Sequence, residues 1–345
     1  MQKVLKATQR RDKDDSNISR YRRLGTDMDC YASGSVGGKA SVRTVHLRTA
    51  HLKLIGENLD LPVHTIPHEK GDFKQWKPPS PFYPTPSIPP SNHLLVTASF
   101  GRILPRSLLQ LFHPSRRLNV HPSLLPKYRG PAPIQHAILN GEKETGVCVI
   151  EMLERAKGID TGDIWGLKSV PIPENSTFLT LREKLAREGG DLLVSVLRDM
   201  LSKTVASIPQ IVSPNTPTAP LVTASLCRPE FDKQTACELV RLDRAISHQK
   251  PITTLMFQSD RSVQLHKLFD VTPSIDSSED FKLPETPGVA RYDPSKKAVL
   301  VRCANGSVLG VSNLKSQDRK LVPAKEWWNG IPKEWKEMDG CVHFV

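Results

Sequence analysis

The sequence predicts a two-domain protein, in which an α/β domain built on a parallel sheet precedes a small β-barrel. Three observations lead to this prediction. The chain has 345 residues, which is enough for two cores. Its middle third alternates apolar runs with helical patterns, as buried parallel strands and their crossover helices do. Its last third carries short strand patterns at close spacing, which is typical of a small barrel.

The chain begins with residues 1–35, which have no hydrophobic period and mix charges with Gly and Ser, so we expect them to be poorly ordered. Acidic residues follow the first basic ones closely, which does not favour a transit peptide. Residues 48–58 fit a helix and Leu61–Ile66 a short strand. Seven prolines then predict an extended loop at 77–91. A ligand for an SH3-type domain is the rarer alternative for this loop.

The α/β pattern starts at Leu94–Ser99, a continuous apolar run that fits a strand buried on both faces. Helices and strands are expected next at 105–112 (helix), 118–120 (strand), 133–140 (helix), 145–152 (strand), 163–170 (strand) and 181–200 (helix). Gly141 can close the second of these helices, and Gly189 and Gly190 are the expected weak point of the last.

A domain boundary is expected within residues 204–222, which are rich in Pro, Thr and Ser, and we set it between residues 212 and 213. Residues 232–247 have helical spacing. Five strand patterns follow, at 253–257, 262–269, 288–292, 298–302 and 308–314. Turn residues such as Asn305-Gly306 separate them, so residues 213–345 are expected to form the barrel.

Composition excludes several classes of protein. No run approaches the roughly 18 apolar residues of a membrane span, so we expect no membrane association. Six cysteines lie far apart without a CxxC pair, which argues against a zinc site or a disulfide framework and favours a reducing compartment. The formal net charge of +12 attracts polyanions such as nucleic acid. A basic protein without such a partner fits this charge equally well.

Polar residues that can take part in catalysis lie near the end of one predicted strand. Asn119 and His121 are two apart, so a strand turns both toward one face. Asp160 lies in a loop flanked by glycines after another strand, and ligands bind where such strands end. An amide, an imidazole and a carboxylate can stabilise an oxyanion and move protons in acyl transfer. The same residues also fit purely structural roles: Asn119 can hydrogen-bond its own turn, His121 can lie on the surface, and Asp160 can stabilise a turn. Taken alone, the three residues therefore leave the catalytic and the structural interpretation open.

Four motifs in order decide between these interpretations. They are Ser99–Pro105 (SFGRILP), Asn119–Pro126 (NVHPSLLP), Arg129–Gln135 (RGPAPIQ) and Gly158–Asp163 (GIDTGD), and they span more than 60 residues. Together they resemble the core of the folate-dependent formyltransferases, most closely the branch that formylates methionyl-tRNA. The resemblance implies a Rossmann-like formyltransferase domain at 36–212 and an OB-like barrel at 213–345 that helps to hold tRNA.

The resemblance also implies a reaction, in which 10-formyltetrahydrofolate gives its formyl group to the α-amine of methionine on initiator tRNA. Asn119, His121 and Asp160 would be the catalytic residues, with Asn119 and protonated His121 at the oxyanion and Asp160 holding His121 charged. The residues expected to line the folate site are Ser123, Leu124, Leu125, Pro126, Phe100, Gly101, Arg102, Ile103 and Leu104. The residues expected to contact tRNA are Lys315, Arg319 and Lys320. No metal is expected.

One departure from the family concerns residues 1–35, in which we find no counterpart of its first strand-helix-strand unit. We therefore expect the chain as written to be poorly soluble or inactive. The enzymatic alternatives are formylation of a purine-precursor ribonucleotide or of an amino sugar, and the non-enzymatic one is an inactive folate- or tRNA-binding remnant. We expect a monomer, located in mitochondria by resemblance, with the cytoplasm as the alternative.

Overall fold

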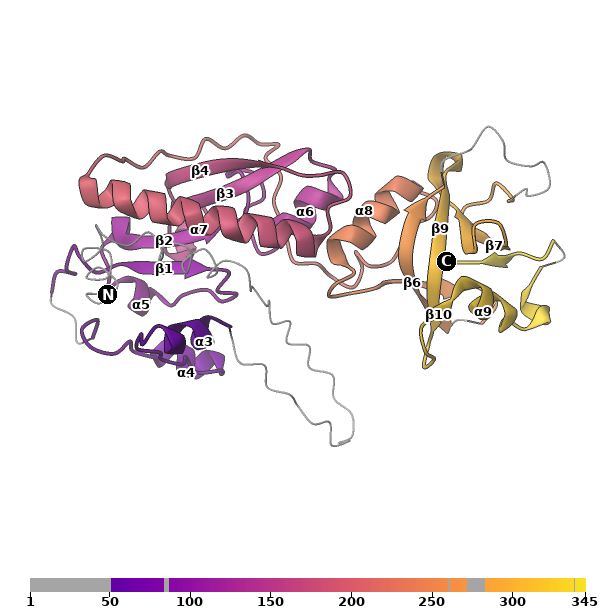
Figure 1. Ribbon diagram of the computed structural model, residues 1–345, viewed down its shortest axis with the longest axis horizontal. Coiled ribbons are helices and arrows are strands. Elements are labelled where there is room, and N and C mark those ends of the chain that lie inside the picture. The colour runs from indigo at the N-terminus through magenta and orange to yellow at the C-terminus, as the bar shows by residue number, and fades with distance from the viewer. Residues whose placement is uncertain (1–50, 84–86, 260, 272–282, 338) are drawn as a thin grey trace. The chain divides into compact units, whose positions relative to one another are not determined.

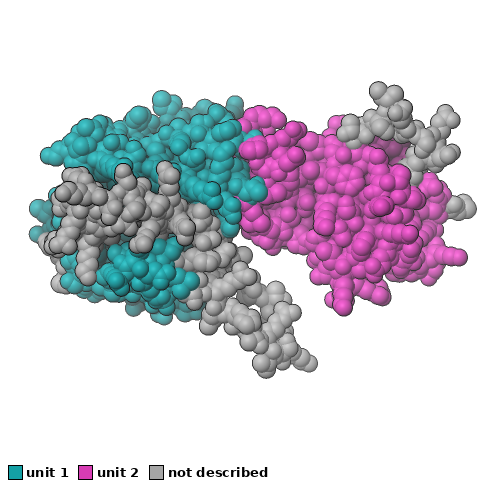
Figure 2. Space-filling model, in the orientation of Figure 1, with its two compact units in different colours: residues 1–133, 144–172, 180–219 teal, residues 134–143, 173–179, 220–345 magenta. Residues whose placement is uncertain are grey.

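The computed structural model describes residues 51–83, 87–259, 261–271, 283–337 and 339–345 (Figure 1). The stretch 1–35, expected to be poorly ordered, lies outside these residues. The chain divides into two compact units that interleave along the sequence (Figure 2). Unit 1 comprises residues 1–133, 144–172 and 180–219, and unit 2 comprises residues 134–143, 173–179 and 220–345.

A four-stranded sheet forms the centre of unit 1. Its strands, in spatial order, are β1 (Leu95–Ala98), β2 (Arg117–His121), β3 (Glu144–Glu151) and β4 (Ile164–Pro171). β1 and β2 run parallel, whereas β3 and β4 are each antiparallel to the strand before them. The parallel pairing expected for Leu94–Ser99 holds for the first two strands, and the sheet becomes antiparallel beyond them. The expected burial of this strand on both faces is wrong, because residues of β1 alternate between half-buried and exposed.

Helix α7 (Phe178–Ser202) packs along this sheet (Figure 1). Its residues Val196 and Met200 join Leu118 and Val149 of the sheet in one buried cluster. The helix continues through the glycine pair, so the expected weak point does not interrupt it. Gly189 instead permits a close approach, because a Cβ there would lie 2.9 Å from Cγ1 of Val120.

Three short α-helices and one 3-10 helix are described in unit 1 before β2. They are α3 (His51–Asn58), α4 (Lys70–Gln75), α5 (Arg106–Leu109) and η3 (Pro114–Arg116). The strand expected at Leu61–Ile66 is wrong, because residues 61–67 adopt no regular structure. A strand needs a neighbour for its backbone hydrogen bonds. Among the described residues, β1 pairs only with β2, so no strand is present beside 61–66 to complete a ladder.

Unit 2 is built on an antiparallel sheet. Its strands are β5 (Ile252–Met256), β6 (Arg261–Asp270), β7 (Val289–Asp293), β8 (Ala298–Arg302), β9 (Val308–Ser316), β10 (Val322–Pro323) and β11 (Val342–His343). The order is β11-β7-β8-β9-β6-β5, with β10 beside β9. Leu255 and Val345 exchange backbone hydrogen bonds of 3.0 and 2.9 Å, which brings the two edges together. The five strands expected in this region are confirmed as β5 to β9, and the expected barrel is nearly closed.

Two helices pack on this sheet, α8 (Ala236–Ile246) and α9 (Ala324–Asn329). α8 begins with a capping box between Thr235 and Glu238. Helix α6 (Pro133–Leu139) belongs to unit 2 from its second residue on, and Arg241 of α8 donates to the Leu139 carbonyl at 3.2 Å. Among the helices that the structure describes, none is both long and apolar enough to cross a membrane.

Candidate active site

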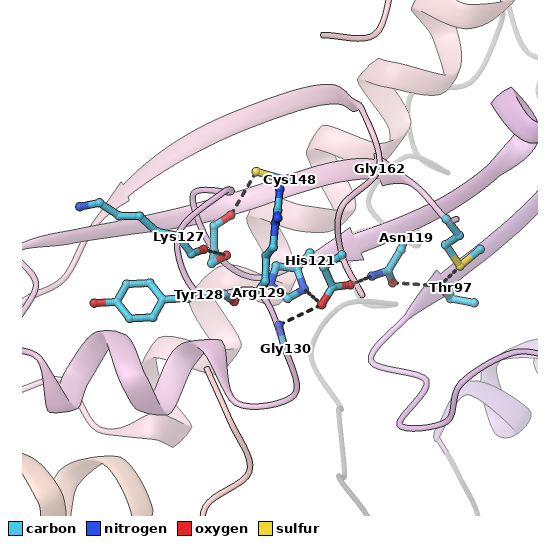
Figure 3. Close-up of polar contacts among 12 residues, drawn as sticks. Thr97, Asn119, His121, Lys127, Tyr128, Arg129, Gly130, Cys148 and Gly162 are labelled. Atoms are coloured by element: carbon cyan, nitrogen blue, oxygen red, sulfur yellow. Dashed lines mark hydrogen bonds and ion pairs between the residues drawn. The ribbon is translucent and has the colours of Figure 1, made fainter. Parts of the chain in front are cut away.

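Asn119 and His121 lie in β2, beside the Arg129–Gly130 segment (Figure 3). Both side chains lie close to Asp160. The Nδ1 atom of His121 lies 3.6 Å from Oδ2 of Asp160. The Nδ2 atom of Asn119 lies 3.5 Å from Oδ1 of the same carboxylate. Strand alternation places the first two residues on one face, and the loop after β3 supplies the third. The three residues that the sequence suggested therefore share one site.

His121 is buried, and both of its ring nitrogens face acceptors. Its Nε2 atom lies 3.0 Å from the backbone oxygen of Tyr128, and its Nδ1 atom faces Asp160. A carbonyl only accepts, so Nε2 carries a proton. At 3.6 Å the contact between Nδ1 and the carboxylate is too long for a hydrogen bond. The Tyr128 carbonyl and the nearby carboxylate together hold the ring in a fixed orientation.

Asp160 holds a left-handed backbone conformation with φ of 54°, which costs a non-glycine residue of the order of 1 kcal/mol or more. Hydrogen bonds from neighbouring segments hold it there. The backbone N–H of Gly130 donates to Oδ2 at 3.1 Å, and Gln210 Nε2 donates to the Asp160 carbonyl at 2.9 Å. The carboxylate is thus aimed at Asn119 and His121 by partners on both sides of its own loop.

Thr97 fixes the orientation of the Asn119 amide. It lies opposite Asn119 in the parallel register of β1 and β2, and its hydroxyl donates to Asn119 Oδ1 at 2.9 Å. The Asp160 carboxylate only accepts, so it requires the amide nitrogen, and the amide oxygen then faces the Thr97 hydroxyl. The same hydroxyl also lies 3.1 Å from the Met152 sulfur. Thr97 was not predicted from the sequence. The available signal was a polar residue within the apolar run at Leu94–Ser99.

Arg129 and Gln210 form a second pair that the sequence analysis missed. Arg129 donates from Nε and Nη2 to Oε1 of Gln210, at 3.0 and 2.6 Å. Burial lowers the pKa of Arg129, and the nearby Asp160 carboxylate opposes this shift. Arg129 belongs to the motif Arg129–Gln135, but nothing in the sequence linked it to Gln210, which lies 81 residues further on.

The segment Ser123–Pro126 follows β2 directly and forms a tight turn. The Ser123 hydroxyl donates to the Lys127 carbonyl at 2.8 Å, and the Cys148 thiol of β3 donates to the Ser123 carbonyl at 3.1 Å. Burial raises the pKa of Cys148 to about 11, so this thiol keeps its proton. The Leu124 side chain packs against Gly146 of β3, and a Cβ atom at position 146 would overlap it. The turn is therefore anchored on β3, beside His121.

The segment Phe100–Leu104 follows β1. Because β1 and β2 are parallel, this segment and Ser123–Pro126 leave the sheet at the same edge. The Arg102 guanidinium donates to the carbonyls of Pro67 and His68 at 2.7 and 2.8 Å, and the Phe100 ring lies 5.8 Å from that of Phe73. Gly101 and Ile103 are exposed. The residues expected to line a folate site thus lie in two segments at the edge that holds Asn119.

Three basic residues expected to contact tRNA lie in unit 2. Lys315 is half-buried in β9, whereas Arg319 and Lys320 are exposed in the turn between β9 and β10. Nearby, burial and the charge of Lys315 lower the pKa of His266. Within the described part of the chain, no group of three or more His, Cys, Asp or Glu residues is placed to hold a metal ion.

Comparison with known proteins covers both halves of the chain. Residues 88–197 match the family described as formyl transferase, and residues 223–332 match the formyl transferase C-terminal domain. Mitochondrial methionyl-tRNA formyltransferase of Mus musculus is 35% identical over 251 residues, which cover 72% of this chain and 62% of the mouse protein. The Homo sapiens counterpart is 32% identical over 290 residues, 82% of this chain and 72% of the human protein.

A solved structure shares the fold. The N-formyltransferase from Helicobacter canadensis, in complex with folinic acid and dTDP-3-aminofucose, aligns with a TM-score of 0.53 at 18% identity, over 77% of this chain and 83% of that chain. The chain spans less than two thirds of the mouse relative's length, at 62%. The human relative is matched over 72% of its length at 32% identity. On these matches, the chain belongs to the formyltransferase family.

Proposed function

We propose that this protein transfers the formyl group of 10-formyltetrahydrofolate to the α-amine of methionine on initiator tRNA. The observation that carries the proposal is the convergence of Asn119 and His121 on Asp160 at the end of β2. The curated relatives named above are methionyl-tRNA formyltransferases. The structural neighbour with folinic acid supports a folate as formyl donor.

The reaction needs a new bond from the amine nitrogen to the formyl carbon, followed by cleavage of the bond from that carbon to N10 of the folate. The formyl oxygen becomes an oxyanion in between. Asn119 has a second amide hydrogen besides the one directed at Asp160, and it can donate this hydrogen to the oxyanion. The Nε2 atom of His121 faces the Tyr128 carbonyl and its Nδ1 atom faces Asp160, so a protonated His121 would act on the oxyanion mainly through its positive charge.

Proton balance falls to Asp160 in this scheme. The attacking amine must lose a proton, and N10 of the folate must gain one. The Asp160 carboxylate lies beside both other residues and can hold a water that carries the proton from one nitrogen to the other. In this scheme the bonds form and break within the two substrates, while Asn119, His121 and Asp160 stabilise charge and move the proton.

The substrate sites follow from the same proposal. The folate would lie along Phe100–Leu104 and Ser123–Pro126, which leave the sheet at one edge. Methionyl-tRNA would be held by the domain at 213–345, with Lys315, Arg319 and Lys320 at its phosphates. We also propose a mitochondrial location, since the mouse and human relatives are mitochondrial.

An amino sugar is the second candidate acceptor, because the Helicobacter canadensis enzyme was solved with dTDP-3-aminofucose. The test offers the full chain 10-formyltetrahydrofolate with either methionyl-initiator tRNA or dTDP-3-aminofucose, and measures formylated product. The proposed function replaces the expectation, drawn from residues 1–35, that the chain as written is inactive, because residues 88–197 and 223–332 both match formyl transferase domains. It predicts formyl-methionyl-tRNA and no formylated sugar. Transfer to the sugar alone would replace the proposed acceptor. A folded protein that transfers to neither would favour the inactive remnant.

A further inference from the structure

A glutamine on the segment after α7 contacts the loop that carries Asp160. The Nε2 atom of Gln210 donates to the backbone oxygens of Asp160 and Gly162, at 2.9 and 2.7 Å. Its Oε1 atom accepts from Nε and Nη2 of Arg129, at 3.0 and 2.6 Å. An amide side chain has two donor hydrogens and two acceptor lone pairs. Gln210 therefore uses its full hydrogen-bonding capacity within the protein.

The partners of Gln210 permit only one orientation of its amide. The two carbonyl oxygens can only accept, so they require the nitrogen. The guanidinium of Arg129 can only donate, so it requires the oxygen. No other side chain of this length meets both demands, since a carboxylate would face two carbonyl oxygens and a thioether would donate to neither. The pattern therefore specifies glutamine at position 210.

The segments that Gln210 joins both control Asp160. One is the loop 158–163, where Asp160 has its left-handed backbone and Gly162 packs so closely that a Cβ would overlap the Glu151 carbonyl. The other is Arg129 with the adjacent Gly130, whose N–H donates to Asp160 Oδ2 at 3.1 Å. Gln210 thus holds the backbone of Asp160 and, through Arg129, the donor to its carboxylate.

We propose that Gln210 is a positioning residue that keeps the Asp160 carboxylate within reach of His121 and Asn119. It acts from 50 residues beyond Asp160 in the sequence, on a stretch that the composition marks only as a linker. The expected fall in the rate of formyl transfer rests on the proposed function, whereas the expected loosening of the Asp160 carboxylate does not. The transfer rate and the mobility around Asp160 can therefore be measured separately.

The first test compares three variants of the full chain in the formylation assay. Gln210→Met keeps the length of the side chain and removes its hydrogen bonds. Gln210→Glu keeps an acceptor for Arg129 but places a carboxylate oxygen against the carbonyl oxygens of Asp160 and Gly162. Gln110→Glu, at an exposed position in the same unit, is the matched control. We expect kcat to fall about ten- to a hundredfold in both Gln210 variants, with KM within about twofold. Normal kcat in Gln210→Met would overturn the proposal.

The second test follows amide hydrogen exchange and needs no activity. In Gln210→Met the Gly130 amide should exchange about tenfold faster, because the carboxylate that accepts from it is no longer held. Exchange at Val149, buried in β3, should not change. Equal acceleration at Val149 would assign Gln210 to overall stability and overturn the proposal, as would unchanged exchange at Gly130. If the wild type transfers no formyl group while Gly130 alone accelerates, the proposed function fails and the positioning role stands.

Discussion

At the scale of single residues, Asp160 joins the parts of the candidate site. Its carboxylate faces His121 and Asn119 and accepts from the Gly130 backbone, and its carbonyl accepts from Gln210. A carboxylate with this many partners has little freedom, and fixed dipoles stabilise developing charge better than mobile ones. The predicted effects of substitution are therefore largest where these interactions meet.

Substitution of the three converging residues tests their roles. Asn119→Ala should lower kcat by about a hundredfold, the usual effect of removing one oxyanion donor. His121→Ala and Asp160→Ala should be as severe or worse, and double variants should lose less than the product of the single effects. Steady-state kinetics on variants with unchanged melting temperatures measure this. A near-normal rate in any one would remove that residue from the site.

Thr97 offers a milder test of how the Asn119 amide is oriented. Thr97→Val keeps the shape of the side chain but removes the proton donated to Asn119 Oδ1. One hydrogen bond is worth about 1 kcal/mol, so kcat should fall by roughly five- to tenfold. Thr97→Ser, which keeps the hydroxyl, is the matched control and should stay near the wild-type rate. Equal rates in both variants would show that Thr97 does not orient the amide.

Asn119, His121 and Asp160 could be predicted because they belong to motifs that follow one another in a recognisable order over more than 60 residues. Thr97 and Gln210 carry no such signal. Their roles depend on partners 22 and 50 residues away, which only the folded chain brings together. A hydroxyl in an apolar run and an amide in a linker look ordinary until those partners are known.

At the scale of secondary-structure elements, two properties of a strand decided whether the sequence could predict it: its number of residues and the presence of a neighbouring strand. Strands β5 to β9 have at least five residues each, and β5 and β6 alternate between buried and more exposed side chains. Strands β10 and β11 have two residues each, too few for a period, and were missed. The prediction of a strand at Leu61–Ile66 was wrong for a different reason. Its local sequence pattern fits a strand, but the described residues provide no neighbouring strand to pair with it.

The closure of the barrel gives a prediction at this scale. Phe344 is almost fully buried, at 1% exposure, while the adjacent Val345 side chain is 53% exposed. Phe344→Ala should therefore lower the free energy of unfolding by about 3–5 kcal/mol, as truncation of a buried aromatic does. Val345→Ala keeps the backbone pairing with Leu255 and should cost under about 0.5 kcal/mol. Urea denaturation of both variants tests this, and equal stabilities would contradict it.

At the scale of the whole molecule, the two units are not consecutive halves of the sequence. Unit 1 extends to Ala219, whose N–H donates to the Arg129 carbonyl at 2.8 Å, so the segment expected to be a linker helps to build the site. Unit 2 includes residues 173–179, where the Phe178 ring stacks on His248 at 3.8 Å. Composition could suggest where the chain changes character, but it could not show which segments pack together.

The proposed tRNA-binding residues predict a change in salt dependence. Replacing Arg319 and Lys320 by Gln should reduce the slope of log affinity against log salt, by roughly 0.7–0.9 for each phosphate that the protein no longer neutralises. Adding Lys315→Gln should reduce it further. Lys296→Gln with Lys297→Gln, an exposed adjacent pair in another turn of unit 2, is the matched control. Equal slopes for the two double variants, measured by tRNA binding over a salt series, would contradict the assignment.

Single-turnover formylation tests the central claim most directly. Excess protein is mixed with 10-formyltetrahydrofolate and methionyl-initiator tRNA, and formyl-methionine is measured over time in wild type and in Asn119→Ala. We predict complete conversion by the wild type and a rate about a hundredfold lower in the variant. A folded wild-type protein that makes no formyl-methionine, or a variant as fast as the wild type, would contradict the account.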